Sequence, residues 1–229
     1  MYKLEKNLLH VQKRIQAAAH RSSRSDEDIT LLAVSKRHSA DNIRDAYQCG
    51  QRDFGENYLQ EARDKQQKLR DCEIIWHFIG PIQSNKTRTI AENFDWVHSV
   101  GRLKIAQRLS EQRPKSLAPL KICIQINIDN EDSKSGVTPQ DAYELAAEIQ
   151  LLPNLKLCGL MTIPAARESI EQQGHAFAQL AQLSQTLKSQ LELTEFDTLS
   201  MGMSGDLDAA IAEGATIVRI GTAIFGQRS

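Results

Sequence analysis

The feature that most constrains the fold is a regular alternation of short apolar segments with helix-like segments along the chain. The first apolar segment, residues 29–36, is a β-branched and apolar run of the kind that forms a buried strand. The strand-like segments span residues 29–36, 53–57, 74–79, 96–100, 121–127, 157–163, 198–203 and 216–220. Strand-then-helix order predicts an α/β protein with a parallel sheet, and eight such units in 229 residues fit a closed (β/α)8 barrel. An open, doubly wound sheet is the alternative.

A helix or a short turn is expected after each strand, and one extra helix at residues 4–19 precedes the first strand. Thr138 and Pro139 are read as the cap and the first residue of one of these helices. The other helices are expected over residues 39–49, 58–69, 86–93, 102–112, 168–189 and 206–213. No linker, repeat or low-complexity run is evident, so residues 1–229 are expected to form a single domain.

The composition limits the classes of partner. Hydrophobic residues make up 41% of the chain and the net charge is -1, which gives no reason to expect nucleic acid or membrane as a partner. No apolar run approaches the ~20 residues that span a bilayer, and residues 1–9 do not resemble a signal peptide. The four scattered cysteines favour reduced thiols in a cytoplasmic protein. The six histidines lack metal-ligand spacing, so no metal is expected.

Lys36 ends the first predicted strand. Alternation places Lys36 on the same face as Leu32 and Val34. If that face looks into a barrel, burial would lower the lysine pKa and supply the neutral amine that a Schiff base requires. The alternative is a lysine that simply ends a strand and reaches water.

Two glycine-containing loops follow the seventh and eighth predicted strands. Ser200 to Asp206 carries small and hydroxyl residues directly before a helix, where exposed backbone N–H groups favour an anion. Arg219 to Thr222 offers a second glycine and hydroxyl. The loops after strands seven and eight are the usual phosphate site of this barrel, although glycines also serve turns for purely conformational reasons.

A lysine together with a phosphate site suggests two chemistries: a Schiff-base aldolase acting on a phosphosugar, or a pyridoxal phosphate site. Alternation places Arg219 on the same face as Gly221, so it can point toward a bound ring. A guanidinium cannot accept a proton, so Arg219 beside the pyridine nitrogen would favour the unprotonated ring. An ordinary ion pair is the alternative role for Arg219.

Three further candidates are weaker. Asn57 could contact the ring or line the pocket, but it could equally form a turn. His77 lies inside an apolar strand, where a core histidine is at least as plausible as a ligand contact. Lys134, Ser135 and Gly136 lie in a charged loop that could close over the site, although a solvated loop is the default reading.

Seven motifs together resemble the pyridoxal phosphate homeostasis protein family (YggS-like, with a barrel of the alanine racemase N-terminal type). They are Leu32–Lys36, Phe54–Tyr58, Trp76–Lys86, Asp132–Gly136, Leu160–Met161, Leu199–Ser204 and Val218–Gly226. The resemblance covers essentially the whole chain, in order. Two small departures are Gly205, where an acidic residue is common, and Arg37-His38 directly after the lysine.

The resemblance implies a single TIM barrel of fold-type III that holds pyridoxal phosphate covalently on Lys36. It further implies phosphate contacts from Ser200, Ser204, Gly221 and Thr222, with Arg219 near the pyridine nitrogen. Asn57, considered above, is also assigned to the cofactor site. Members of the family resemble cofactor carriers that keep free pyridoxal phosphate low and affect amino-acid and keto-acid balance. No catalytic residue is therefore assigned, and pyridoxal phosphate-dependent apoenzymes are possible recipients.

The rival hypothesis is an amino-acid racemase, which shares this type of barrel. Racemases of the alanine type add a C-terminal β domain that supplies a second base and much of a dimer interface. The chain ends at Ser229, a few residues after the last strand, so that domain is expected to be absent and the protein to be a monomer. Weak racemase-like activity remains compatible with this interpretation.

Overall fold

The computed structural model describes residues 2–131, 134–165 and 169–227. Asp132 and Ser133 of the resemblance motifs, and Glu168 at the start of one predicted helix, lie outside the described residues. Across the described ranges, no helix is long and apolar enough to cross a membrane.

Parallel strands close into a barrel in which each strand pairs with its neighbours in sequence and β8 returns to β1. The strands are β1 (Thr30–Val34), β2 (Asp53–Glu56), β3 (Ile75–Phe78), β4 (Trp96–Val100), β5 (Leu120–Ile126), β6 (Leu155–Thr162), β7 (Thr198–Ser200) and β8 (Ile217–Ile220). Closure is direct, since Thr30 pairs with Ile217 and Ala33 pairs with Ile220. The predicted (β/α)8 TIM barrel is thus confirmed, and the open doubly wound sheet is wrong.

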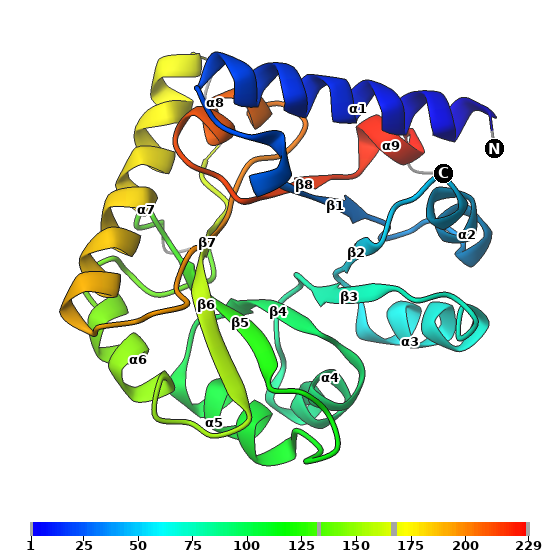
Figure 1. Cartoon of the computed structure of the whole chain (residues 1–229). Coiled ribbons are helices and arrows are strands. Elements are labelled where there is room, and N and C mark those ends of the chain that lie inside the picture. The colour runs from blue at the N-terminus through cyan, green and yellow to red at the C-terminus, as the bar shows by residue number, and fades with distance from the viewer. Residues whose placement is uncertain (1, 132–133, 166–168, 228–229) are drawn as a thin grey trace.

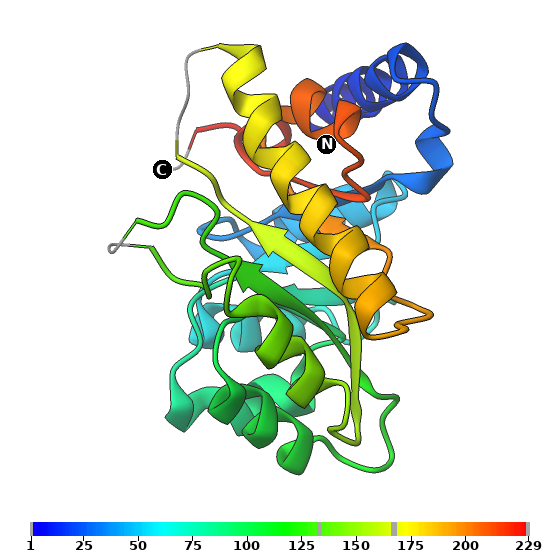
Figure 2. The ribbon, with the colours of Figure 1, turned by 90° about the vertical axis from the view of Figure 1, so that its left-hand side faces the viewer.

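Helices surround the strands on the outside of the barrel (Figures 1 and 2). They are α1 (Tyr2–Arg21), α2 (Ala40–Gln48), α3 (Leu59–Lys68), α4 (Thr87–Asn93), α5 (Leu103–Gln112), α6 (Ala142–Ile149), α7 (Ile170–Gln190), α8 (Leu207–Ala212) and α9 (Thr222–Phe225). Two 3-10 turns, Asp26–Asp28 and Ser84–Lys86, join the elements around them. The strand-then-helix order explains this layering, because each crossover must return the chain to the same end of the sheet.

The extra helix α1 packs against α8 and α9, where the outer layer consists of short helices (Figure 1). Apolar residues at helical spacing, among them Leu8, Val11 and Ile15, are buried against the barrel. On the polar side, Asn7 donates to the carbonyl oxygen of Ile224 at 2.9 Å and Arg14 donates to that of Ser204 at 2.6 Å. The helix therefore supports the two loops in which the sequence places the phosphate site.

Most predicted boundaries lie within two residues of the observed ones, and two differ by three residues. α6 begins at Ala142 and not at the predicted Pro139; the Thr138 hydroxyl accepts the Asp141 N–H at 3.3 Å and donates to its carboxylate at 2.7 Å, so Thr138 caps a turn that precedes the helix. The predicted strand over residues 198–203 ends at Ser200, because Gly202 adopts a φ of 91° that a strand cannot accommodate. A side chain at Gly202 would also collide with Ala210, at 2.5 Å from its Cβ.

Candidate functional site

Lys36 lies in the turn after β1, at the end of the barrel where the strands finish. The predicted alternation holds, because Val34 and Lys36 line the same cavity and Lys36 is half-buried. Arg37 then takes a left-handed conformation with a φ of 64°, which is uncommon for a residue with a side chain. The backbone around the lysine is therefore turned sharply out of the strand.

A buried ion-pair network fixes this turn from the side of α3. The Nζ of Lys65 donates to the Ser35 carbonyl oxygen at 2.8 Å, and to Oε1 of Glu56 and of Glu61 at 2.6 Å each. The Ser35 hydroxyl also donates to Glu56 Oε1 at 2.6 Å, and Glu61 accepts the Arg37 N–H. Burial raises the pKa of Glu56, and the adjacent ammonium of Lys65 opposes that shift. Sequence reasoning missed this network, because Lys65 is one of many polar residues on a polar helix.

Asn57 follows β2 and brings a polar atom into the same region. Its Oδ1 is buried and accepts no hydrogen bond from the part of the chain that the structure describes. Buried acceptors without a partner are rare in proteins, and a bound ligand is one way to satisfy them. The neighbouring loop approaches closely, since a Cβ on Gly80 would lie 2.1 Å from the Asn57 carbonyl oxygen.

Ser204, Gly221 and Thr222 line the same cavity from the loops after β7 and β8, and β8 is the strand next to β1. Gly221 packs closely on the end of β1, because a Cβ on this residue would lie 3.1 Å from the Val34 carbonyl oxygen. Thr222 begins α9 directly afterwards. The two loops thus bring two hydroxyl groups and a glycine into the cavity that Lys36 also lines.

Arg219 is almost fully buried in β8 and lines the cavity. Its Nη1 donates to the carbonyl oxygen and the hydroxyl of Ser200, at 2.5 and 2.9 Å, and its Nη2 donates to the Thr162 carbonyl oxygen at 2.8 Å. None of the hydrogen bonds described for Arg219 goes to a carboxylate. Burial lowers the pKa of Arg219 to about 10, so the guanidinium remains a cation and a donor at neutral pH.

The cavity has a volume of about 270 Å³ and brings together six of the seven predicted cofactor residues. Those residues are Lys36, Asn57, Ser204, Arg219, Gly221 and Thr222. Apolar side chains complete its wall, which gives the mixture of apolar surface and few polar groups typical of small-molecule sites. Ser200 is not among the lining residues; it is fully buried and its hydroxyl contacts Arg219 and His98.

Of the three weaker candidates, His77 and the loop with Lys134 lie outside this cavity. His77 is fully buried and contacts His98 and Asp53, which fits the core histidine that the sequence left open. Lys134 and Ser135 border an adjoining cavity of about 290 Å³ that shares Asn57 with the first. The described residues hold no cluster of three or more histidine, cysteine or acidic side chains that could bind a metal ion.

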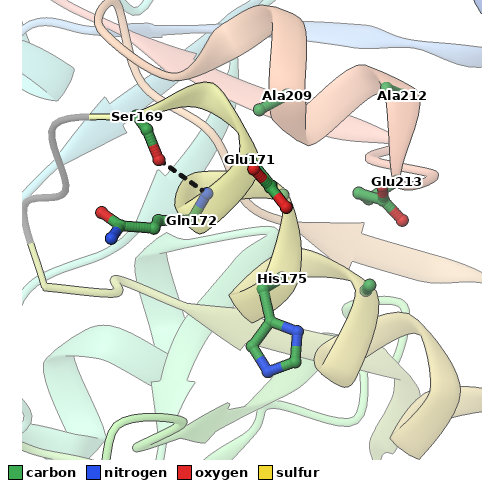
Figure 3. A pocket seen from close by; sticks show the side chains of 9 residues that line it. Ser169, Glu171, Gln172, His175, Ala209, Ala212 and Glu213 are labelled. Atoms are coloured by element: carbon green, nitrogen blue, oxygen red, sulfur yellow. Dashed lines mark hydrogen bonds between the residues drawn. The ribbon is translucent and has the colours of Figure 1, made fainter.

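A larger cavity of about 950 Å³ lies outside the barrel, between α7 and α8 (Figure 3). Glu171 and His175 from α7 and Glu213 after α8 line it, and the Ser169 hydroxyl caps α7 by accepting the Gln172 N–H. The surface is open, and it contains none of the predicted site residues. Although it is larger, this cavity is therefore a poorer candidate for the functional site than the cavity around Lys36.

Known proteins resemble this chain over its full length. The sequence pattern of the family described as "Alanine racemase, N-terminal domain" matches residues 7–229. The "Pyridoxal phosphate homeostasis protein" of Pseudomonas aeruginosa is 56% identical over 228 residues, which cover 100% of this chain and 97% of that protein. The chain belongs to the pyridoxal phosphate homeostasis protein family. The member from Escherichia coli (strain K12) is 52% identical, with 97% of this chain and 95% of that protein covered.

Solved structures agree with the family assignment. PipY of Synechococcus elongatus PCC7942, solved with PLP bound, has a TM-score of 0.85 at 35% identity and covers 97% of this chain and 100% of its own. Alanine racemase from Corynebacterium glutamicum has a TM-score of 0.67 at 18% identity, with 100% of this chain and 62% of the racemase covered. At 18% identity, this similarity shows a shared barrel fold only.

Proposed function

We propose that this protein binds pyridoxal phosphate on Lys36 and takes part in intracellular homeostasis of the cofactor, as a carrier or regulator that affects amino-acid and keto-acid balance. The observation that carries the proposal is the cavity in which an amine, an amide, two hydroxyls and a guanidinium surround one small space. Membership of a family named for this function supports it, as does PipY with PLP bound.

The residues present fit the cofactor. The buried Asn57 Oδ1, which has no hydrogen-bond partner among the described residues, offers an acceptor, and the absence of a side chain on Gly221 lets its backbone lie close to Val34 beside the cavity. Lys36 would hold the aldehyde carbon, while Ser204, Gly221 and Thr222 would bind the phosphate. Arg219 would donate to the ring nitrogen. Since the Ser200 hydroxyl is engaged by Arg219 and His98, the proposal gives Ser200 the task of supporting Arg219.

The same residues argue for a carrier rather than a catalyst. Bound pyridoxal phosphate acts as an electron sink most strongly when its ring nitrogen is protonated. Arg219 can only donate, so it disfavours that protonation. Tyr58, the one tyrosine near a predicted strand end, is half exposed and is not among the residues that line the cavity. The cytoplasmic location, the monomeric state and apoenzymes as recipients stay predictions.

Borohydride reduction of the protein loaded with pyridoxal phosphate, followed by peptide mapping, tests the site. The pyridoxyl group should be found on Lys36; a label found only on another lysine would contradict the proposal. A second assay mixes loaded protein with a pyridoxal phosphate-dependent apoenzyme and follows its reactivation. Deuterium exchange at Cα of L-alanine at ~1 s⁻¹ or faster would instead favour a racemase.

A further inference from the structure

A line of polar side chains crosses the otherwise apolar interior of the barrel. It runs from Asp53 at the start of β2 through His77 in β3 and His98 in β4 to Ser200 at the end of β7. The two histidines and Ser200 are fully buried. The contacts are 3.0 Å from Asp53 Oδ1 to His77 Nε2, 2.9 Å from His77 Nδ1 to His98 Nε2, and 2.8 Å from His98 Nδ1 to Ser200 Oγ.

The direction of each hydrogen bond in this line follows from Asp53 and from neutral histidine rings. The carboxylate of Asp53 can only accept, so His77 carries its proton on Nε2 and donates it to Oδ1 at 3.0 Å. The Nδ1 of a neutral His77 then accepts from His98 Nε2–H, and the Nδ1 of a neutral His98 accepts from the Ser200 hydroxyl. Ser200 Oγ also accepts an Arg219 N–H at 2.9 Å, because Arg219 can only donate.

With both histidines neutral, each ring has one defined tautomer, with its proton on Nε2. Burial supports this state, because it lowers the pKa of His77 and lowers that of His98 well below the ordinary value. The groups that face the two rings are Asp53, Asp95, Lys121 and Arg219. The line connects a buried cation at one end to a carboxylate at the other through neutral groups.

We propose that Asp53, His77, His98 and Ser200 form one directed hydrogen-bond chain that positions the Arg219 guanidinium in the cofactor cavity. This inference rests on the proposed function, since its consequence is that Arg219 is held ready to donate to the ring nitrogen of pyridoxal phosphate. Ser200 and the Thr162 carbonyl oxygen fix the two terminal nitrogens of Arg219 from inside the barrel. His77 and His98 are thus positioning residues, and Asp53 extends the site to the opposite end of the barrel.

The first experiment needs no cofactor. Nitrogen-15 NMR of the cofactor-free protein, labelled in its histidines, reports which ring nitrogen carries the proton. His77 and His98 should both show the Nε2–H tautomer at neutral pH, with strongly downfield N–H protons. Either ring protonated on Nδ1, or on both nitrogens, would overturn the directed chain.

The second experiment measures binding of pyridoxal phosphate by fluorescence, together with the nitrogen-15 shift of its ring nitrogen. His98→Leu breaks the chain and should raise Kd about tenfold and move the ring shift. The amide of His98→Gln can still accept from Ser200 and donate to His77. This variant should therefore keep a Kd and a ring nitrogen shift close to those of the wild type. Asp53→Asn should raise Kd about threefold without touching the cavity. The exposed carboxylate of Asp197, just before β7, gives the control: Asp197→Asn should change nothing.

The outcomes separate the two proposals. Wild-type binding with unchanged Kd and ring shift in His98→Leu and Asp53→Asn would overturn the positioning chain and leave the proposed function intact. If His98→Leu does not fold, Asp53→Asn alone tests the chain: an unchanged Kd and ring shift in this variant would overturn it. A wild-type protein that does not bind pyridoxal phosphate would overturn the proposed function and the positioning of Arg219 for it, whereas the NMR tautomers would still report on the chain.

Discussion

Acid should destabilise the folded chain through the two histidines in the barrel. Burial lowers the pKa of His77 and, more strongly, that of His98 from the ordinary value of 6.5. In the unfolded chain both rings take up protons below about pH 6.5, whereas the lowered pKa values shift protonation in the folded chain to lower pH. Since the unfolded chain then binds more protons, the free energy of unfolding falls as the pH falls.

The size of this effect has an upper limit. At pH 5.5, a histidine that is protonated only in the unfolded chain lowers the free energy of unfolding by about 1.4 kcal/mol. At pH 7.5 the same contribution is below about 0.1 kcal/mol. His77 and His98 together therefore predict a loss of up to about 2.7 kcal/mol between these pH values. That is a large part of the roughly 5–15 kcal/mol that stabilises an ordinary domain.

Urea unfolding of the cofactor-free protein, followed by circular dichroism at several pH values, measures the loss directly. A double variant, His77→Asn with His98→Asn, should lose this part of the pH dependence even if it is less stable at every pH. The exposed His175 on α7 gives the matched control, and His175→Gln should keep the wild-type slope. A flat wild-type curve between pH 7.5 and 5.5, or a double variant with the wild-type slope, would refute the reasoning.

Three further predictions concern packing and charge. Gly80→Ala places a Cβ 2.1 Å from the Asn57 carbonyl oxygen, so it should cost about 1–3 kcal/mol in urea unfolding and weaken pyridoxal phosphate binding. Gly174→Ala in α7 is the counterpart, since its Cβ meets nothing closer than 3.6 Å; it should stabilise the protein by about 0.5–1 kcal/mol. Lys65→Met leaves the buried carboxyl of Glu56 without its ammonium and should cost about 3–5 kcal/mol in the same assay.

The sequence by itself determined the barrel and the ends of its strands. Hydrophobic periodicity and chain order are local properties, and in a parallel α/β protein they are sufficient to predict the order of strands and helices. The position of Lys36 at a strand end followed from the apolar run that stops there, and alternation predicted a face on which Lys36 and Arg219 could point inward; both line the cavity. Family motifs then predicted which strand ends share one cavity, and six of the seven predicted cofactor residues line it.

Only the tertiary structure decided which polar groups meet. Ser200 bonds to His98 across 102 residues of sequence, and Arg219 bonds to the Thr162 carbonyl oxygen across 57. Such contacts depend on how side chains from non-adjacent strands meet inside a closed barrel, and no local sequence pattern predicts that. The same holds for Lys65, whose place on a polar helix gave no sign that it would be buried among carboxylates. Burial then sets the protonation of these groups, because a low-dielectric interior penalises each charge that lacks a partner.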